Sequence, residues 1–339
     1  MLRFLLAALA SSLLTALLRQ ALLAAGMLDR PGRRRLHAWP VARGGGLAIV
    51  LTVLGGGALL VFDSPPLTGL LVGVLPVALA GWLDDWRGLG IAPRLALQLL
   101  SAIILVVAML AWGPDWPVGA LPVAGLAVLA LLAVITAINL HNFIDGANGM
   151  LCWQALFVLL VIAGLGADSA QPLSTLALLS AAAVLGFLPF NFPRARVFLG
   201  DVGSGTLGYL LAGLSLYAWL SGIFSLPQLL LLNALVWIDG LATLLTRMLA
   251  GKAWWLGHRE HLYQWLVRSG NSHALVSLGY LAVNLLLVLP GVLALRARSP
   301  RVSPFGDHAE WVVLIGLAGV GYLAWVFAKR ACLRRLRAQ

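Results

Sequence analysis

The sequence predicts an all-α polytopic membrane protein, and three observations support that fold class. Of the 339 residues, 61% are hydrophobic. Only 10% are charged, whereas soluble proteins carry about 25%. Apolar runs near the length of a helical span, about 20 residues, recur from one end of the chain to the other. We therefore expect one membrane domain over residues 1–339 and no soluble domain.

Division of the chain at its polar, Gly and Pro breaks predicts about eleven transmembrane helices. Some of these segments are short for a span, so ten crossings also fit the pattern. The segments are 4–24, 44–62, 67–83, 95–112, 118–138, 150–166, 173–190, 204–221, 226–248, 274–295 and 309–328.

The basic residues predict the orientation. Nineteen of the 23 Lys and Arg residues are predicted on one side of the membrane. One is Arg19, at the end of the first segment. The other eighteen lie in alternate connections, which are 25–43, 84–94, 191–203, 247–273 and the tail 329–339; the connection 139–149 belongs to the same side. Because Lys and Arg are retained in the cytoplasm, these loops are expected inside, with a periplasmic N-terminus and a cytoplasmic C-terminus in a bacterial inner membrane. The arginines at 33–35 disfavour a cleaved signal peptide. Topology also explains the net charge of +11 without a nucleic-acid partner.

Two carboxylates, Asp84 and Asp85, follow the third segment. Adjacent carboxylates near hydrocarbon are costly unless they are paired or bind a metal. Like charges this close also raise the pKa of one member, which suits a general base. The alternative is a solvated helix end with Arg87 as the partner of the pair.

Residues 139–149 (NLHNFIDGANG) gather amides and a carboxylate where the fifth segment ends. Asn139, Asn142 and Asp145 are spaced to share one helix face. With Asn148 they offer ligands for a metal's water shell, a uracil edge or sugar hydroxyls. A polar helix cap explains one such residue, but not four within ten positions.

Residues 191–205 (NFPRARVFLGDVGSG) form a third cluster. Ser204 is expected to cap the next helix, and Asp201 to hold Mg²⁺ that bridges to phosphate oxygens. Arg194 and Arg196 either grip the same phosphates or anchor the chain at the cytoplasmic surface. Asn191 begins the cluster.

The longest inner loop contains residues 258–264 (HREHLYQ). His258 and His261 have no third ligand nearby, so phosphate contact by these residues and Arg259 is favoured over zinc. Asp239, deep in the ninth segment, is a functional candidate by its position. A structural ion pair with Arg247 is the favoured reading for it.

Two glycine runs, 44–46 and 55–57, also stand out. The second run favours helix packing through small residues. For the first, which follows Arg43 at a membrane boundary, packing and phosphate contact by exposed amides both remain open.

Taken together, these clusters resemble the polyprenyl-phosphate N-acetylhexosamine-1-phosphate transferase family, which is glycosyltransferase family 4. The similarity rests on the order 40–45 (PVARGG), the DD pair, NxxNxxDGxNG, FN…GDxGSxxLG and the His-rich final loop. Each pattern is weak alone, but together they cover almost the whole chain.

The resemblance implies ten or eleven helices, a cytoplasmic cleft and Mg²⁺ (or Mn²⁺). It also implies a UDP-linked N-acetylated sugar and the lipid carrier undecaprenyl phosphate, whose phosphate attacks the donor and releases UMP. By motif position, Asp201 resembles the metal ligand, Asp84 the base, and Asp85 a support for metal or substrate. Asp145 and the asparagines of the clusters resemble nucleotide- and metal-facing positions, and His261 the first histidine of the last motif. Direct attack and a covalent intermediate both remain open, as does a homodimer.

Two departures bear on the sugar. Asn148 stands where many members have Asp, and residues 261–264 read HLYQ where many have HxHH. The HRxHxYQ form resembles the O-antigen-initiating branch, which handles sugars such as N-acetylfucosamine or N-acetylquinovosamine. A peptidoglycan- or teichoic-acid-type member is the alternative within the family.

Proteins of other classes fit the pattern less well. A secondary transporter would place its ionisable residues near the membrane midplane, whereas here nearly all are predicted at one interface. A CDP-alcohol phosphotransferase needs DGxxAR…GxxxDxxxD, of which only Asp145-Gly146 is present. A non-catalytic scaffold would not need four acidic clusters at one depth.

Overall fold

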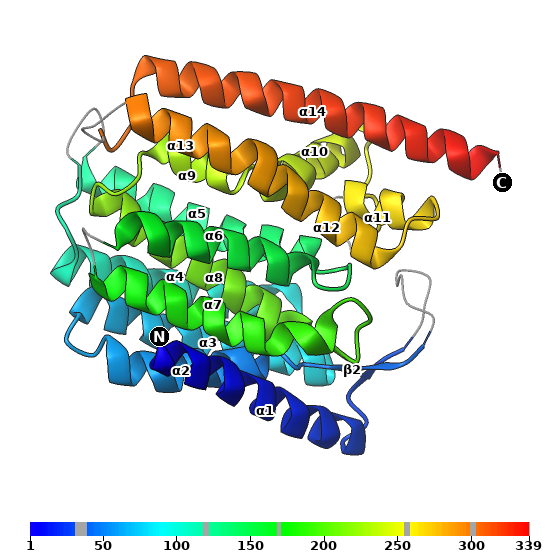
Figure 1. Cartoon of the computed structure of the whole chain (residues 1–339), viewed down its shortest axis with the longest axis horizontal. Helices are drawn as coiled ribbons and strands as arrows, with labels where there is room; N and C mark the ends of the chain where they lie inside the picture. Colours follow the sequence, from blue (N-terminus) through cyan, green and yellow to red (C-terminus); the bar gives the residue numbers. More distant parts are fainter. Residues whose placement is uncertain (31–38, 118–121, 168–170, 254–257, 299–302, 339) are drawn as a thin grey trace.

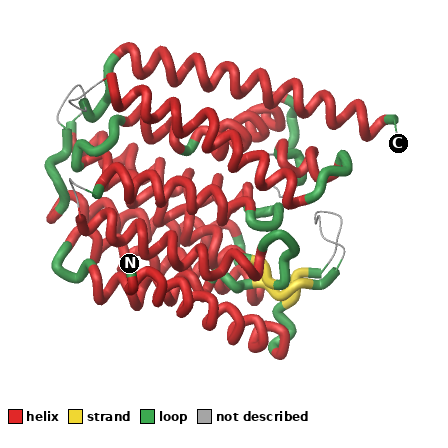
Figure 2. Tube along the Cα trace, in the orientation of Figure 1, coloured by secondary structure: helices red, strands yellow, loops and turns green. Residues whose placement is uncertain are grey.

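The computed structural model describes residues 1–30, 39–117, 122–167, 171–253, 258–298 and 303–338. Long helices run side by side in a bundle (Figure 1). A small sheet lies at one end of it (Figure 2), the end at which α14 and the C-terminus project. The arginines at 33–35 lie outside the described residues.

Each predicted segment corresponds to a helix or to consecutive helices. In chain order they are α1 (Leu2–Ala24), α2 (Leu47–Leu60), α3 (Pro65–Arg87), α4 (Ile91–Trp112), α5 (Val123–Ile144), α6 (Met150–Gly166), α7 (Gln171–Asn191), α8 (Gly200–Leu220), α9 (Leu226–Leu232), α10 (Ala234–Leu249), α12 (His273–Val283), the π-helical η1 (Asn284–Val288), α13 (Leu289–Arg298) and α14 (His308–Arg337). An additional short helix, α11 (Leu262–Arg268), follows the last inner loop.

The prediction of a mainly helical, polytopic membrane protein is confirmed. Within the described residues, seven helices are long and apolar enough to cross a membrane, or up to eight if the bent pair α9–α10 is one span. The helices α2 and α6 are apolar but shorter. The predicted count of eleven crossings is therefore not supported by helix length and composition. The segment predicted at 226–248 is bent by 77° between α9 and α10.

The sheet departs from the all-helical prediction. Its strands are β1 (Leu28–Asp29), β2 (Val41–Arg43) and β3 (Val197–Phe198). β1 pairs with β2 antiparallel, and β2 pairs with β3 in parallel, with Arg43 opposite Phe198. Strands of two or three residues are too short to show an alternating pattern, so nothing local in the sequence signals them.

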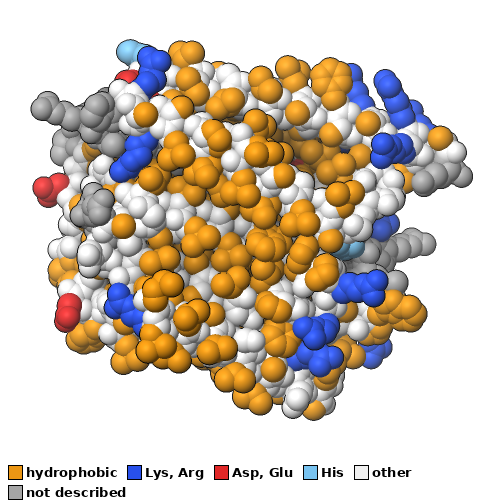
Figure 3. Space-filling view, viewed as in Figure 1, with side chains coloured by type: hydrophobic (Ala, Val, Ile, Leu, Met, Phe, Trp, Pro, Cys, Tyr) orange, Lys and Arg blue, Asp and Glu red, His pale blue; other side chains and the backbone are white. Residues whose placement is uncertain are grey.

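Helix α1 is polar inside and apolar outside, as expected for a helix in lipid. Ser11 and Thr15 are fully buried, and Ser11 Oγ donates to the Ala183 carbonyl of α7 at 2.6 Å. Leucines such as Leu13 and Leu17 are more than 60% exposed. Apolar side chains likewise cover the face in Figure 3, while Lys and Arg gather towards its ends. The bundle thus presents its hydrophobic surface outward, towards the bilayer.

Glycines bring the helix backbones close together. A Cβ on Gly186 would lie 2.1 Å from the Ala8 carbonyl oxygen, and one on Gly46 would lie 2.3 Å from Gly203 Cα. The amides of Gly45 and Gly46 donate to the carbonyls of Phe198 and Leu199. Gly45 therefore packs against β3 and Gly46 against α8, and neither amide is free to contact a phosphate.

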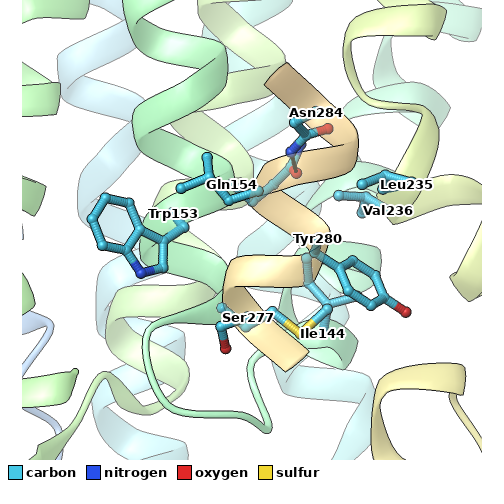
Figure 4. Close-up of a pocket in the computed structure, with 10 residues that line it drawn as sticks. Ile144, Trp153, Gln154, Leu235, Val236, Ser277, Tyr280 and Asn284 are labelled. Atoms are coloured by element: carbon cyan, nitrogen blue, oxygen red, sulfur yellow. Dashed lines mark hydrogen bonds between the residues drawn. The ribbon is translucent and has the colours of Figure 1, made fainter. Parts of the chain in front are cut away.

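An amide pair joins α6 to the C-terminal helices. Asn284, the first residue of η1, donates through Nδ2 to Gln154 Oε1 at 2.7 Å, and both residues line a small cavity between α6, α10 and α12 (Figure 4). Both side chains are at least 95% buried. Within the described part of the chain, Gln154 Nε2 and Asn284 Oδ1 have no hydrogen-bond partner. The two amides depend on each other because the bilayer core offers no competing water.

Asn284→Leu is expected to lower the free energy of unfolding by roughly 1–3 kcal/mol, because Gln154 would lose its remaining side-chain partner. The double variant Gln154→Leu/Asn284→Leu should lose less than the sum of the single losses, since neither amide is then left unpaired. Thermal unfolding in detergent, followed by fluorescence of the 13 tryptophans, measures both. Strictly additive losses would contradict this coupling.

Candidate active site

The sheet places Arg43 beside the start of α8. The guanidinium of Arg43 contacts two carboxylates, with Nε 2.6 Å from Asp85 Oδ1 and Nη2 2.7 Å from Asp201 Oδ1. Burial opposes the charge on Arg43, but the carboxylates of Asp201 and Asp85 raise its pKa above the ordinary value. Arg43 therefore stays charged and holds two acidic clusters together that lie far apart in the sequence.

Asp85 caps the start of α8 from the neighbouring helix α3. Its side chain is fully buried, and it accepts the backbone N–H groups of Asp201 at 2.9 Å and Val202 at 3.1 Å. A Cβ on Gly200, where φ is +73°, would lie 2.3 Å from Asp85 Oδ2, so only glycine fits there. The expected cap, Ser204, instead lies inside α8, and its buried hydroxyl has no partner among the described residues.

Asp84 and Asp201 form the accessible acidic pair of the site. Their carboxyl groups are in hydrogen-bonding contact, and each side chain is about 15% exposed. Asp84 Oδ1 also accepts the Leu89 N–H at 2.7 Å. Arg94 Nη1, from the first turn of α4, lies 4.0 Å from Asp84 Oδ2 and 3.9 Å from Asp201 Oδ2.

This donor set suits Mg²⁺. Mg²⁺ usually binds one or two carboxylates and completes its shell with water and substrate phosphates. Asp84 and Asp201 provide two carboxylates in contact. A divalent cation bound between them would offset the repulsion between their negative charges. Across the described residues no group of three or more His, Cys, Asp or Glu side chains forms a closed metal cage. The geometry thus fits a metal shared with a phosphate ligand. Asp85, which was also predicted to support the metal, instead uses its oxygens to cap α8.

Asp145 is a carboxylate without a partner among the described residues. It follows the last turn of α5, and among the described residues its side chain makes no hydrogen bond or ion pair. Burial, followed by the carboxylates of Asp201 and Asp85, raises the pKa of Asp145 to about 7. A carboxylate with this pKa near the acidic pair is suited to accept a proton at neutral pH.

The asparagines predicted to bind substrate serve different purposes. Asn139 donates to Gln98 Oε1 of α4 at 2.8 Å. Asn148 donates to the Pro193 carbonyl at 3.1 Å, and its own carbonyl accepts the Ser277 hydroxyl. The buried Asn191 accepts the Gly149 N–H at 2.7 Å and donates to Val197. Asn142 has no side-chain hydrogen bond within the described residues. Asn139 therefore joins two helices, Asn148 and Asn191 hold loops together, and Asn142 remains open to a ligand.

The two arginines of the third cluster are exposed. Arg196 donates to the Pro189 carbonyl at 2.8 Å and lies over the Phe190 ring. Arg194 makes no hydrogen bond or ion pair within the described part of the chain, so its guanidinium is open to an anion. Neither arginine pairs with Asp201.

The histidines of the final loop stack on each other, with ring centroids 4.9 Å apart. The ring of His261 is also 5.8 Å from that of Phe143, two residues before Asp145. Tyr263 Oη donates to the Phe143 carbonyl at 2.9 Å, which docks the loop on the end of α5. Burial lowers the pKa of His258 to about 4 and also lowers the pKa of His261, although Asp239 opposes it there. The Arg259 side chain is half-buried.

The ion pair predicted between Asp239 and Arg247 is wrong. Arg247 pairs with Glu260 and donates to the Ala253 carbonyl at 2.9 Å. Asp239 instead accepts the Leu262 N–H at 2.8 Å and the Trp325 indole N–H at 2.9 Å. The prediction rested on the spacing of the two residues along one helix. In the structure each of them forms its hydrogen bonds with other loops and helices.

Three functional contacts were missed in the sequence. Arg94 lies between Asp84 and Asp201, and Gln98, one turn later on α4, reaches Asn139. Their spacing of four residues at the start of an apolar helix is the signal that marks a shared polar face. Tyr263 carries no such local signal, because its partner lies 120 positions away.

Comparisons with known proteins show which family the chain resembles. Residues 67–219 match the family described as glycosyl transferase family 4. The decaprenyl-phosphate N-acetylglucosaminephosphotransferase of Mycobacterium tuberculosis (strain CDC 1551 / Oshkosh) is 30% identical, over 88% of this chain and 82% of the relative. A probable undecaprenyl-phosphate N-acetylglucosaminyl 1-phosphate transferase of Bacillus subtilis (strain 168) is 27% identical, over 77% and 75%. The phospho-N-acetylmuramoyl-pentapeptide-transferase of Thermosynechococcus vestitus is 32% identical, over 60% and 55%.

The matched region of the family includes Asp84 and Asp85 at the end of α3, the loop that carries Asp145, and the start of α8. The mycobacterial relative extends the similarity over most of both chains. The chain therefore belongs to glycosyl transferase family 4, among relatives named as polyprenyl-phosphate N-acetylglucosamine phosphotransferases.

Proposed function

We propose that this protein transfers an N-acetylated sugar-1-phosphate from a UDP-sugar to a polyprenyl phosphate, taken to be undecaprenyl phosphate. The observation that carries the proposal is the meeting of Asp84, Asp201 and the unpaired Asp145 with Arg43 at one end of a membrane helix bundle. An oxygen of the carrier phosphate attacks the β-phosphorus of the donor. The bond from that phosphorus to the oxygen of the α-phosphate breaks, and UMP leaves.

A divalent cation, Mg²⁺ or Mn²⁺, fits the contact between Asp84 and Asp201. When bound, it would neutralise the phosphate charges and stabilise the charge that develops on the leaving phosphate. Arg43 orients Asp201 from one side. Arg94 supplies a second positive charge on the open side of the acidic pair, where it is placed to hold a phosphate oxygen.

Two carboxylates are candidates for taking the proton of the carrier phosphate. Asp84 already accepts the Leu89 N–H and contacts Asp201, so its oxygens are largely occupied. Asp145 is unpartnered among the described residues, and its pKa of about 7 is close to that of a phosphate monoester. We therefore favour Asp145 as the general base. Asn142, Arg194 and His261 are free to contact the donor.

The basic residues support a topology for this site. Arg43 lies in β2, and Asp84, Asp145 and Asp201 lie at helix ends, all at the end of the bundle where α14 projects (Figure 1). We infer that this end faces the cytoplasm, with eleven helical elements in the bilayer of a bacterial inner membrane, a periplasmic N-terminus and a cytoplasmic C-terminus. Soluble UDP-sugars would then reach the site directly.

For the sugar, the relatives' names support N-acetylglucosamine, whereas the HRxHxYQ form supports the O-antigen branch and its modified sugars. In this chain Gln264 is buried and bonded to Tyr263 Oη and to the His261 N–H. Gln264 stands where HxHH has its last histidine, and its side chain holds the loop together. We place the enzyme at the first membrane step of a surface polysaccharide, with a peptidoglycan- or teichoic-acid-type role as the alternative.

Purified protein in detergent with Mg²⁺ and undecaprenyl phosphate is expected to release UMP from at least one donor of a panel. The panel contains UDP-GlcNAc, UDP-FucNAc, UDP-QuiNAc and UDP-MurNAc-pentapeptide. Chromatography of the nucleotide product distinguishes UMP, which requires sugar-1-phosphate transfer, from UDP, which requires sugar transfer alone. Release of UDP, or of no nucleotide with any donor, would refute the proposed reaction, and a transporter would then become the next candidate.

A further inference from the structure

Asp239 is a buried carboxylate to which the proposed reaction gives no role. It lies within α10, with only 2% of its surface exposed. An ionisable group in this position is costly unless it is paired or hydrogen-bonded. Its Oδ1 accepts the Leu262 N–H at 2.8 Å and the Trp325 indole N–H at 2.9 Å, and its Oδ2 accepts the Tyr280 hydroxyl at 3.2 Å.

These donors come from three other elements. Leu262 is the first residue of α11, Tyr280 lies in α12 and Trp325 in α14. The carboxylate thus joins two long helices of the C-terminal half to the start of α11. The residue held at that junction is His261, whose own N–H donates to Gln264 Oε1 at 3.2 Å. The backbone on both sides of His261 is fixed by these two contacts.

The ring of His261 lies between Asp239 and the loop that carries Asp145. Its Nδ1 is 3.9 Å from Asp239 Oδ1 and has no hydrogen-bond partner within the described residues. The residue is 98% buried, and its ring centroid lies 5.8 Å from that of Phe143. A carboxylate this close to one nitrogen of a histidine stabilises the imidazolium when it forms.

We propose that Asp239 is a positioning residue that acts through His261. It fixes the start of α11 through the Leu262 amide, and its charge lies 3.9 Å from His261 Nδ1, where it favours the imidazolium form of the ring. In that form the other ring nitrogen carries an Nε2–H, which donates to a phosphate oxygen of the donor. The inference rests on the proposed function, because it takes His261 to contact the donor.

Asp239→Asn separates this role from a purely structural one. The Asn oxygen still accepts from Leu262 and Trp325, and its amide group can donate to the Tyr280 oxygen, so the packing is kept while the charge beside His261 is lost. We expect kcat/KM for UMP release to fall by about tenfold or more, as for other carboxylates behind a functional histidine. The melting temperature should stay close to that of the wild type. Tyr280→Phe, which removes only the donor to Oδ2, is the matched control and should keep wild-type kcat/KM.

A double-mutant cycle shows whether Asp239 acts through His261. In a His261→Ala background, Asp239→Asn should cause no further loss, because the residue through which it acts is gone. Losses that multiply would mean an independent structural effect and would overturn the inference. Full activity of Asp239→Asn alone would also overturn it.

A measurement without turnover keeps the two proposals distinguishable. The chain has six histidines, so ¹⁵N-histidine NMR in detergent can identify the His261 signals by their absence in His261→Ala. Asp239→Asn should shift these signals and leave those of His308, at the opposite end of α14, unchanged, whereas the signals of His258, which stacks on His261, are expected to follow those of His261. Wild-type protein that releases no UMP would refute the proposed function. Unshifted His261 signals in Asp239→Asn would refute the role of Asp239, whatever the activity.

Discussion

Asp201→Ala is expected to reduce UMP release by roughly 10³-fold, which corresponds to about 4 kcal/mol of lost transition-state stabilisation. Asp201 is the carboxylate at which the site converges, since Arg43 contacts its Oδ1, Arg94 lies 3.9 Å from its Oδ2, and Asp84 contacts the same carboxyl group. Its removal takes away one of the two oxygen ligands in contact and leaves the proposed cation with Asp84 alone. Steady-state rates over a Mg²⁺ titration measure the effect, and excess Mg²⁺ should not restore the rate.

Asp63→Asn is the matched control for Asp201→Ala. Asp63 is an exposed carboxylate in the connection between α2 and α3, at the end of the helices opposite the site. Its substitution should leave the rate and its Mg²⁺ dependence unchanged. The α8 start should remain intact in Asp201→Ala, because the cap comes from Asp85 and accepts backbone amides. A variant that folds and keeps more than about a tenth of the wild-type rate, a loss of only about 1.4 kcal/mol, would remove Asp201 from the metal site.

The sequence predicts most helices because an apolar run is a local signal. The runs predict α1, α4 and α7 to within a few residues. They do not predict which side of α1 carries its buried Ser11, because lipid and protein interior are both apolar. The break at Asn233 was missed for a related reason. Both α9 and α10 are apolar, so composition alone shows one continuous segment.

The sequence predicts which clusters form the site, but not the role of each residue within a cluster. Asp84 and Asp85 are adjacent and equal in the sequence, yet Asp85 caps α8 while Asp84 contacts Asp201. That difference depends on the close approach of α3 and α8 at Gly81, where a Cβ would lie 2.4 Å from the Asp201 backbone. Asn191 looks like a binding residue by its motif, yet its side-chain amide is hydrogen-bonded to two backbone groups. Long-range contacts of this kind decide which polar residue is free, and a local pattern does not contain them.

Asp145 connects the chemistry of the site to its stability. Burial, with the carboxylates of Asp201 and Asp85, raises the pKa of Asp145 from its ordinary value of 3.8 to about 7. The folded state therefore binds this proton more tightly than the unfolded state does. Its contribution to stability is fully present below about pH 4 and is lost as the pH rises through about 7. A general base has the opposite requirement, because only the ionised carboxylate accepts a proton. Activity is gained over the same range of pH in which stability is lost.

Asp145→Asn separates these two effects, because the amide resembles the protonated carboxyl group and cannot act as a base. We expect UMP release to fall by about 10²- to 10⁴-fold, the usual contribution of a general base. In metal-free buffer at pH 8 the variant should melt at a higher temperature than the wild type, whereas near pH 4 the two should melt together. The exposed Asp115, replaced in the same way, should change neither property. An inactive variant that is also less stable at pH 8 would mean that Asp145 has a partner that stabilises its ionised form, and would exclude it as the free base. A fully active variant would leave Asp84 as the proton acceptor, so the pair of measurements decides between the two carboxylates.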